Sequence, residues 1–274
     1  MSEFARNLPP LNDKVANSAR MYDYFLGGSH NFSIDRKTAD MMDSVYPGTR
    51  MTARANRAFL RRVVKYLVSE GVDQFLDLGS GVPTVGNVHE IAQAKLPGAR
   101  VVYVDVEPVA VKAAQRLLAD NPDATTIRAD LRDTHAILNH PDLRALLDLS
   151  RPVAVLVMSV LHFVPDSDDP NAVIADYRDA IVPGSFLALS HGTDAPVRAE
   201  TVPASAMEGL MKIFAANESS VTLRSPERIT QLFEGFELVE PGLVPIFDWR
   251  PEDPHEFDEW RDQIPFYGAV GRKL

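Results

Sequence analysis

The hydrophobic pattern of the first seventy residues has helical spacing. Within residues 49–70 the apolar positions recur every three or four residues and would form one buried stripe, comprising Phe59, Leu60, Val63, Val64, Leu67 and Val68. A shorter helix is expected to begin at Asn17 or Ser18 and to end at Gly27 and Gly28, and another is expected over residues 35–47. Residues 1–70 are therefore predicted to form a helical N-terminal extension that could act as a lid.

From residue 71 onward, short apolar runs alternate with helical segments. Strands are predicted at residues 74–78, 100–104, 125–129, 153–158, 186–190, 236–240 and 265–271. Helices are predicted at residues 85–95, from Pro108 onward, and at residues 135–138, 143–147, 171–181, 204–216 and 226–233. This alternation predicts an α/β fold in which a doubly wound, mostly parallel sheet is covered by helices on both faces. Residues 71–274 are expected to form one domain.

Composition narrows the range of functions. Asp and Glu number 38 against 28 Lys and Arg, for a formal charge of −10, which disfavours a nucleic-acid partner. The chain has no cysteine, which excludes disulfides, thiolate zinc sites and a cysteine nucleophile. No other group has metal-ligand spacing, because His89 and Glu90 lack the second histidine of a zinc-binding helix, so we expect no metal. Without an apolar run of about 20 residues or a secretory signal, the protein is expected to be cytoplasmic, with no membrane partner.

Glycines and acids occupy the ends of three successive predicted strands. Gly79 and Gly81 follow the first strand, Asp105 ends the second and Asp130 follows the third. Alternate glycines allow a tight turn against a ligand, and 24 residues separate Gly81 from Asp105, close to the ~20 at which an acid reaches a ribose in nucleotide-binding folds. Each feature alone could be structural, but together they indicate a nucleotide-type site.

The loop chemistry argues against two common nucleotides. A nicotinamide dinucleotide site needs a third glycine, and here that position is Thr84. The loop also lacks the Lys-Ser/Thr ending of an NTPase phosphate loop. An NAD-dependent oxidoreductase therefore stays a less favoured alternative.

The segments FLDLGSGVP, VVYVDVEP and IRADLRD resemble the successive motifs of class I S-adenosylmethionine-dependent methyltransferases. With NSARMYDYFLGG, NRAFLRR, NVHE, VLHFVPD, PGSFLALSH and WRP, the chain is similar from Asn17 to its end to an actinobacterial methyltransferase family of largely unassigned substrate. The resemblance implies a seven-stranded sheet with an antiparallel last strand and S-adenosylmethionine as cofactor. It implies that the methionine part is contacted by Gly79, Ser80 and Gly81, the ribose by Asp105 with Val106, and the adenine by Asp130 and Leu131.

The end of the fourth strand carries the candidate chemistry. In methyltransferases this strand end lies beside the methyl group, so Ser159 is a candidate cofactor contact and His162 a candidate base. His162 could equally cap the strand end or pack under the adenosine. His191 and Asp194, after the fifth strand, are weaker candidates.

Three further features each have a structural alternative. In the N-terminal segment, Arg20 could pair with the methionine carboxylate and Tyr22 could stack there, or Arg20 could face solvent and its apolar neighbours could be ordinary core. An arginine stripe could recruit an anionic acceptor or form a solvated face: Arg50, Arg54, Arg57 and Arg61. Residues 241–263, with Trp249 and Trp260, could line an acceptor pocket or anchor their own loop.

These observations predict S-adenosylmethionine-dependent methyl transfer to an oxygen or nitrogen nucleophile of a small molecule. The alternative from another class is a non-catalytic S-adenosylmethionine-binding sensor or partner protein. The sequence gives neither the acceptor nor the oligomeric state.

Overall fold

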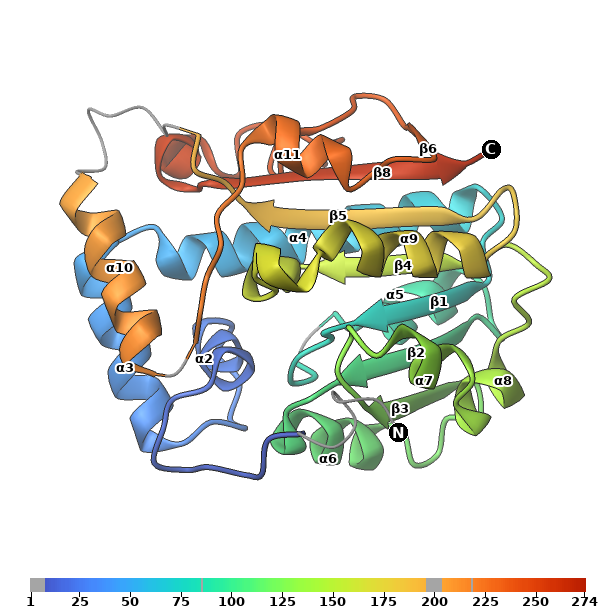
Figure 1. Ribbon diagram of the computed structural model, residues 1–274, viewed down its shortest axis with the longest axis horizontal. Helices are drawn as coiled ribbons and strands as arrows, with labels where there is room; N and C mark the ends of the chain where they lie inside the picture. The colour runs from blue at the N-terminus through green and yellow to red at the C-terminus, as the bar shows by residue number, and fades with distance from the viewer. Residues whose placement is uncertain (1–7, 85, 196–203, 218) are drawn as a thin grey trace.

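A single mixed sheet organises the chain in the computed structural model, which describes residues 8–84, 86–195, 204–217 and 219–274 (Figure 1). The strand order is β3-β2-β1-β4-β5-β8-β6, with β7 paired to β8 off this path. The first five strands in this order are parallel, and β8 runs antiparallel to both β5 and β6. The strand bounds are β1 Gln74–Leu78, β2 Arg100–Asp105, β3 Ala124–Arg128, β4 Ala154–Met158, β5 Phe186–Gly192, β6 Phe236–Leu238, β7 Val244–Pro245 and β8 Phe266–Lys273.

The helices follow the predicted alternation closely. They are α2 Ser18–Phe25, α3 Ser33–Val45, α4 Thr49–Ser69, α5 Val88–Lys95, α6 Pro108–Leu117, α7 Thr134–Leu138, α8 Pro141–Leu146, α9 Pro170–Ala180, α10 Ala204–Ala216 and α11 Pro226–Gln231. Three short 3₁₀ turns are η1 Leu161–Phe163, η2 Asp166–Asp168 and η3 Asp258–Gln263. The doubly wound fold and the antiparallel last strand are thus confirmed.

Two of the differences from the sequence prediction have identifiable reasons. Helix α5 begins at Val88 because Asn87 caps it and receives a reciprocal contact from Glu90, a capping box. The predicted start at Val85 lies outside the described residues. The two-residue strand β7 was not predicted, because it is too short to show an alternating pattern within the irregular connection.

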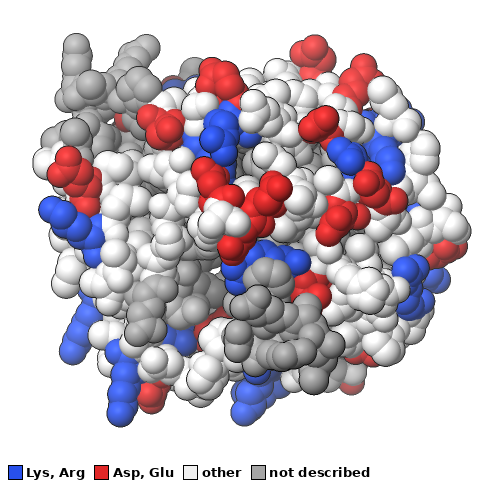
Figure 2. Space-filling model, in the orientation of Figure 1, with Lys and Arg blue, Asp and Glu red and all other residues white. Residues whose placement is uncertain are grey.

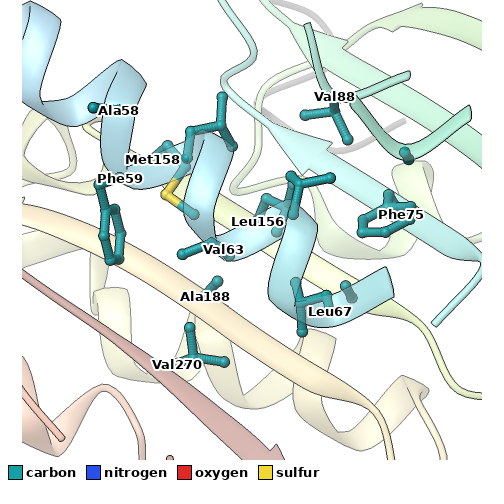
Figure 3. Close-up of a cluster of buried hydrophobic side chains, with 14 of the residues drawn as sticks. Ala58, Phe59, Val63, Leu67, Phe75, Val88, Leu156, Met158, Ala188 and Val270 are labelled. Atoms are coloured by element: carbon teal, nitrogen blue, oxygen red, sulfur yellow. The ribbon is translucent and has the colours of Figure 1, made fainter. Parts of the chain in front are cut away.

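Alternate residues of the strands serve two separate cores. One core joins α4, α5 and α6 to strand residues such as Phe75 and Leu156, and Figure 3 shows Phe59, Val63 and Leu67 of α4 packed against these strands. The other core joins α7, α8, α9 and α11 to the intervening residues of the same strands. Both faces are therefore covered, as a parallel sheet requires.

The N-terminal helices have two roles. Helix α4 runs along one face of the sheet and belongs to the main core, whereas α2 and α3 pack with α10 in a separate apolar cluster. This cluster lies at the end of the sheet to which the parallel strands point, at the left of Figure 1. The carboxyl ends of the strands, where doubly wound folds bind ligands, are thus bordered by helices from two distant parts of the chain.

The connection over residues 241–263 anchors itself to the domain. Trp249 is fully buried and meets Phe59 and Tyr66 edge to face. The guanidinium of Arg62 donates to the carbonyls of Trp249 and Ile246. Of the two sequence interpretations, the structure favours the structural one for Trp249. No helix in the described part of the chain is both long and apolar enough to cross a membrane.

Candidate functional site

A cavity of about 430 Å³ opens at the carboxyl ends of β1, β2 and β4, under the helices α2, α3 and α10. Its volume lies in the range of small-molecule sites. Most of the sequence-predicted site residues line it: Tyr22, Gly79, Ser80, Gly81, Asp105, Val106, Asp130, Leu131, Ser159 and His162. Arg20 and the weaker candidates His191 and Asp194 do not line it. Residues from five regions of the sequence are therefore brought together around one space.

The glycine turn after β1 approaches Val160 too closely for a side chain at Gly79. Gly79 and Gly81 both have φ of 68°, a region that favours glycine, and a Cβ on Gly79 would lie 2.3 Å from a methyl group of Val160. The amide of Gly81 donates to Oδ2 of Asp105 over 2.7 Å. This bond fixes the glycine turn against the end of β2.

Two buried carboxyl groups stand beside this turn. Burial raises the pKa of Asp105 to about 6, although hydrogen bonds from the amides of Glu107 and Gly81 oppose the shift. Burial also raises the pKa of Asp77 to about 7, with the Arg57 charge acting in the opposite direction and Asp105 adding to the rise. Both groups would be stabilised in their ionised form by a cationic ligand.

At the end of β3, hydrogen bonds hold a carboxylate in place. Asp130 accepts hydrogen bonds from the backbone and the guanidinium of Arg132, which also contacts Asp168. Leu131 lies beside it, and its carbonyl accepts a hydrogen bond from the hydroxyl of Tyr177. These contacts orient the third strand end toward the cavity that both residues line.

A chain of hydrogen bonds connects the end of β4 to the N-terminal helices. Ser159 has φ of 55°, and its amide donates to the hydroxyl of Ser190. Ser190 donates to Oδ1 of Asn56, whose Nδ2 donates to the hydroxyl of Tyr22. The Tyr22 hydroxyl in turn donates to the carbonyl of Ala53. Sequence reasoning assigned no role to Asn56 or Ser190, although NRAFLRR begins with Asn56 and PGSFLALSH contains Ser190, because a motif does not show which of its side chains point toward the site.

His162 is buried in the η1 turn that follows β4. Its Nδ1 is buried without a hydrogen-bond partner, and its ring packs against those of Phe163, Phe266 and His191. Burial lowers the pKa of His162 well below its usual value, and the charges of His191 and Arg224 act in the same direction. The imidazole is therefore neutral at neutral pH.

Arg224 holds this turn in place. Its guanidinium donates to the carbonyls of Leu161 and Val164, on either side of His162, and pairs with Asp166. It also donates to Nε2 of His191, which leaves the hydrogen of that ring on Nδ1, donated to the carbonyl of its neighbour Gly192. Burial lowers the pKa of His191 to about 4. His191 is thus a supporting residue rather than an exposed base.

The structure corrects the sequence interpretation of Arg20, which does not line the cavity. Its Nε contacts Asp35 at 2.9 Å and one terminal nitrogen contacts Glu107 at 3.0 Å, while the other donates to the carbonyls of Asn12 and Val15. The side chain is 1% exposed. Its donors are used to hold the N-terminal segment, so they are not free to face a ligand.

Arg57 is the arginine that faces the cavity instead. Its guanidinium lies 5.7 Å from the centre of the Tyr22 ring, and its Nε is buried with no hydrogen-bond partner. The other arginines of the stripe differ: Arg50 and Arg61 pair with acidic side chains, and Arg54 is exposed. The sequence pattern identified the arginine stripe to which Arg57 belongs. The spacing alone did not show which arginine of the stripe faces the cavity.

The described residues contain no cluster of His, Asp or Glu arranged to hold a metal ion. His89 instead contacts the hydroxyl of Tyr103 through its ring and its amide, and Glu90 caps the start of α5. Both residues therefore make structural contacts.

Comparisons with known proteins agree with this geometry. The model of a family described as S-adenosyl methyltransferase matches residues 5–274. The chain belongs to this family. A candidate methyltransferase from Thermobifida fusca is 40% identical, with a TM-score of 0.86, over 95% of this chain and 96% of its own. A DUF574 family protein from Streptomyces avermitilis is 39% identical, with a TM-score of 0.88, over 96% and 99%.

More distant matches show the fold alone. The N-methyltransferase NodS from Bradyrhizobium japonicum, solved with S-adenosylhomocysteine, is 14% identical with a TM-score of 0.50, over 93% of this chain and 98% of its own. No functionally curated protein matches the sequence significantly. The protein is thus a methyltransferase by family and fold, and its cofactor is S-adenosylmethionine.

The residues of the cavity fit this cofactor. The glycine turn that lines the cavity has a backbone conformation that residues with a Cβ rarely adopt, and the carboxyl groups of Asp77 and Asp105 suit a cationic ligand that also carries a ribose. The buried Nε of Arg57 is a free donor for a carboxylate. The family cofactor has all three of these features, a positive charge, a ribose diol and a carboxylate.

Proposed function

We propose that the protein transfers a methyl group from S-adenosylmethionine to an oxygen or nitrogen atom of a small molecule. The observation that carries the proposal is that Ser159 and His162 line the same cavity as the glycine turn and Asp105. An acceptor in this cavity would meet the cofactor next to a buried, neutral imidazole. A small-molecule acceptor fits a cavity of about 430 Å³ that is bordered by helices.

The cofactor-binding roles that we propose follow from the lining residues. Gly79, Ser80 and Gly81 would contact the methionine part with their backbone, and Asp105 would accept hydrogen bonds from the ribose with Val106 beside it. Asp130 and Leu131 would border the adenine. We assign the methionine carboxylate to Arg57, in place of Arg20, because of its buried and unpartnered Nε. Tyr22 would orient Arg57 by stacking on its guanidinium.

When bound, the cofactor supplies a methyl group already activated on a positively charged sulfur. The acceptor atom would take this methyl group as the carbon–sulfur bond breaks, and the electron pair of that bond would remain on the sulfur. The protein mainly orients the two reactants, an effect that can be worth about 7–11 kcal/mol. If the acceptor is a hydroxyl, its proton would pass to the imidazole of His162, held in place by Arg224.

The surface charge favours a small molecule over a nucleic acid. The formal charge is −10, and Figure 2 shows lysine and arginine side chains scattered among aspartate and glutamate on the face that it presents. Nucleic-acid binding depends on basic residues gathered into a patch or stripe. This distribution supports an acceptor that enters the cavity.

The decisive experiment is a transfer assay with S-adenosylmethionine labelled with tritium in the methyl group. The protein is incubated with a metabolite extract of the source organism, and small molecules, proteins and nucleic acids are then separated and counted. We expect label in a small organic product with the wild-type protein and none with an Asp105→Ala variant. Label confined to protein or nucleic acid would contradict the proposed acceptor class. Retained cofactor binding without labelled product in any fraction would favour the non-catalytic alternative.

A further inference from the structure

The cavity is divided into two regions of different chemistry. The charged side chains that line it are Arg57 of α4 and five residues in or just after β1, β2 and β3: Asp77, Asp105, Glu107, Asp130 and Arg132. The opposite wall comes from α2, α3 and α10. We call this wall the methionine chamber and define it by Met21, Phe25, Met42, Met207, Met211 and Phe214.

Apolar packing builds the methionine chamber, and no charged side chain belongs to it. Met21, Phe25 and Met42 are buried in the cluster that joins the N-terminal helices to α10, and Met207 and Met211 pack against that cluster. Methionine side chains are flexible and polarisable, so they can adapt to the shape of an apolar ligand and contact aromatic rings favourably. A charged group placed against this wall would lose its hydration without gaining a partner.

The chamber adjoins the candidate site of chemistry. Phe214 of α10 meets Phe163 edge to face, with ring centres 6.0 Å apart, and Phe163 in turn lies 4.4 Å from the ring of His162. A molecule resting on the methionines would thus extend toward His162. The polar end of such a molecule would find the buried, unpartnered Nδ1 of that imidazole.

We propose that the methionine chamber is the acceptor subsite and selects electrically neutral, largely apolar molecules. The inference rests on the proposed function and narrows its substrate class. It follows from the separation of charge within one cavity. The ionic groups are at the cofactor end, whereas none of the side chains that α2, α3 and α10 contribute to the lining is charged. A carboxylate or ammonium on the acceptor body would be excluded by its desolvation cost.

The test compares 2-naphthol, a neutral probe, with 2-naphthoate, an anion of similar shape. Binding of each is measured by calorimetry with the protein saturated in S-adenosylhomocysteine, so that only the acceptor region is sampled. We expect 2-naphthol to bind at least about tenfold more tightly than 2-naphthoate. Equal affinity for the two probes, or a preference for the anion, would overturn the proposal.

Variants in α10 locate the binding to the chamber. Met211→Lys should weaken 2-naphthol binding by at least about tenfold and strengthen 2-naphthoate binding, because the new cation would lie in the chamber. Met207→Lys, one turn earlier, provides an independent second variant. Ala215→Lys is the matched control, since this exposed residue of the same helix does not line the cavity. Unchanged 2-naphthol affinity in both chamber variants would contradict the assignment.

Binding of S-adenosylhomocysteine separates this inference from the proposed function. It should be retained in all three lysine variants, which also verifies their folding. If the wild-type protein failed to bind S-adenosylhomocysteine, the proposed function would fail. If it bound S-adenosylhomocysteine but showed no preference for the neutral probe, only the chamber assignment would fail.

Discussion

Arg20 in α2 donates a hydrogen bond of 3.0 Å to Glu107, which lies 87 residues further along the chain and caps the start of α6, just after β2. The amide of Glu107 also donates to Asp105, so the contact joins the N-terminal helices to the proposed ribose-binding turn. A second carboxylate, Asp35, shares the same guanidinium. Arg20 therefore supports the site from outside the cavity.

Replacing Arg20 with alanine should destabilise the protein. The variant would leave Asp35 and Glu107 buried without their cation, and breaking a buried ion pair in this way costs about 3–5 kcal/mol. Thermal or denaturant unfolding measures the loss. The control is Arg36→Ala, an exposed arginine of the same region, which should change stability little. An Arg20→Ala protein of unchanged stability but weakened cofactor binding would restore the direct role expected from the sequence.

Replacing Arg57 with methionine should remove recognition of the methionine carboxylate. The wild-type protein is expected to prefer S-adenosylmethionine over its decarboxylated analogue by about tenfold to hundredfold, the usual worth of a hydrogen bond to a charged group. In Arg57→Met that preference should disappear, as measured by calorimetry with both ligands. Arg54→Met is the matched control, because Arg54 is exposed on the same helix. A preference that survives in Arg57→Met would refute the assignment.

Cofactor binding should strengthen as pH rises through the pKa values of Asp105, about 6, and Asp77, about 7. Below these values both groups are protonated in the free protein, and a cationic ligand must displace their protons. Affinity should therefore increase between about pH 5 and 7.5 and level off above. Calorimetry in buffers of different ionisation enthalpy would detect the protons released. Binding independent of pH over this range would show that neither carboxyl group meets the cofactor's charge.

An Asp77→Asn variant should bind the cofactor more weakly than the wild-type protein but should be more stable. The pKa of Asp77 is raised in the folded state, so the unfolded chain releases this proton first, and stability of the free wild-type protein falls as pH rises from about 4 to 7. The variant lacks this ionisation, and its gain in melting temperature should be larger at pH 8 than at pH 5. Scanning calorimetry at both pH values measures it, and a gain larger at pH 5 would contradict the burial effect.

The imidazole of His162 should stay neutral throughout the neutral range. Burial and the nearby charge of Arg224 hold its pKa well below 6.5, so its NMR signals should not titrate above that pH. A His162→Gln variant assigns the signals. In Arg224→Met the pKa should move upward, because one opposing charge is lost. A titration of His162 centred near neutral pH in the wild type would disprove the proposed environment.

Sequence patterns predicted the parts of the site that depend on the order of strands. Gly79, Asp105 and Asp130 stand at the ends of successive parallel strands, and parallel strand ends necessarily meet at one edge of the sheet. Their convergence follows from the alternation of elements. The same reasoning located Ser159 and His162 after β4.

The roles of the arginines could not be predicted in this way. Arg20 and Arg57 both stand on amphipathic helices, and what separates them is which one faces Glu107 and which one faces the cavity. The group that each arginine faces depends on how α2 and α4 dock against the sheet. No local sequence pattern encodes this docking. The methionine chamber could not be predicted from the sequence for the same reason, because its walls come from α2, α3 and α10.

The hydrogen-bond chain from Ser159 to Tyr22 has a further consequence. Each hydroxyl in it donates once and accepts once, and the amide of Asn56 fixes the direction, because its nitrogen can only donate and its oxygen only accept. Such a chain holds its groups in place but cannot conduct protons. A proton removed from an acceptor therefore has no exit toward α4 along these groups, and must return to bulk water by another route.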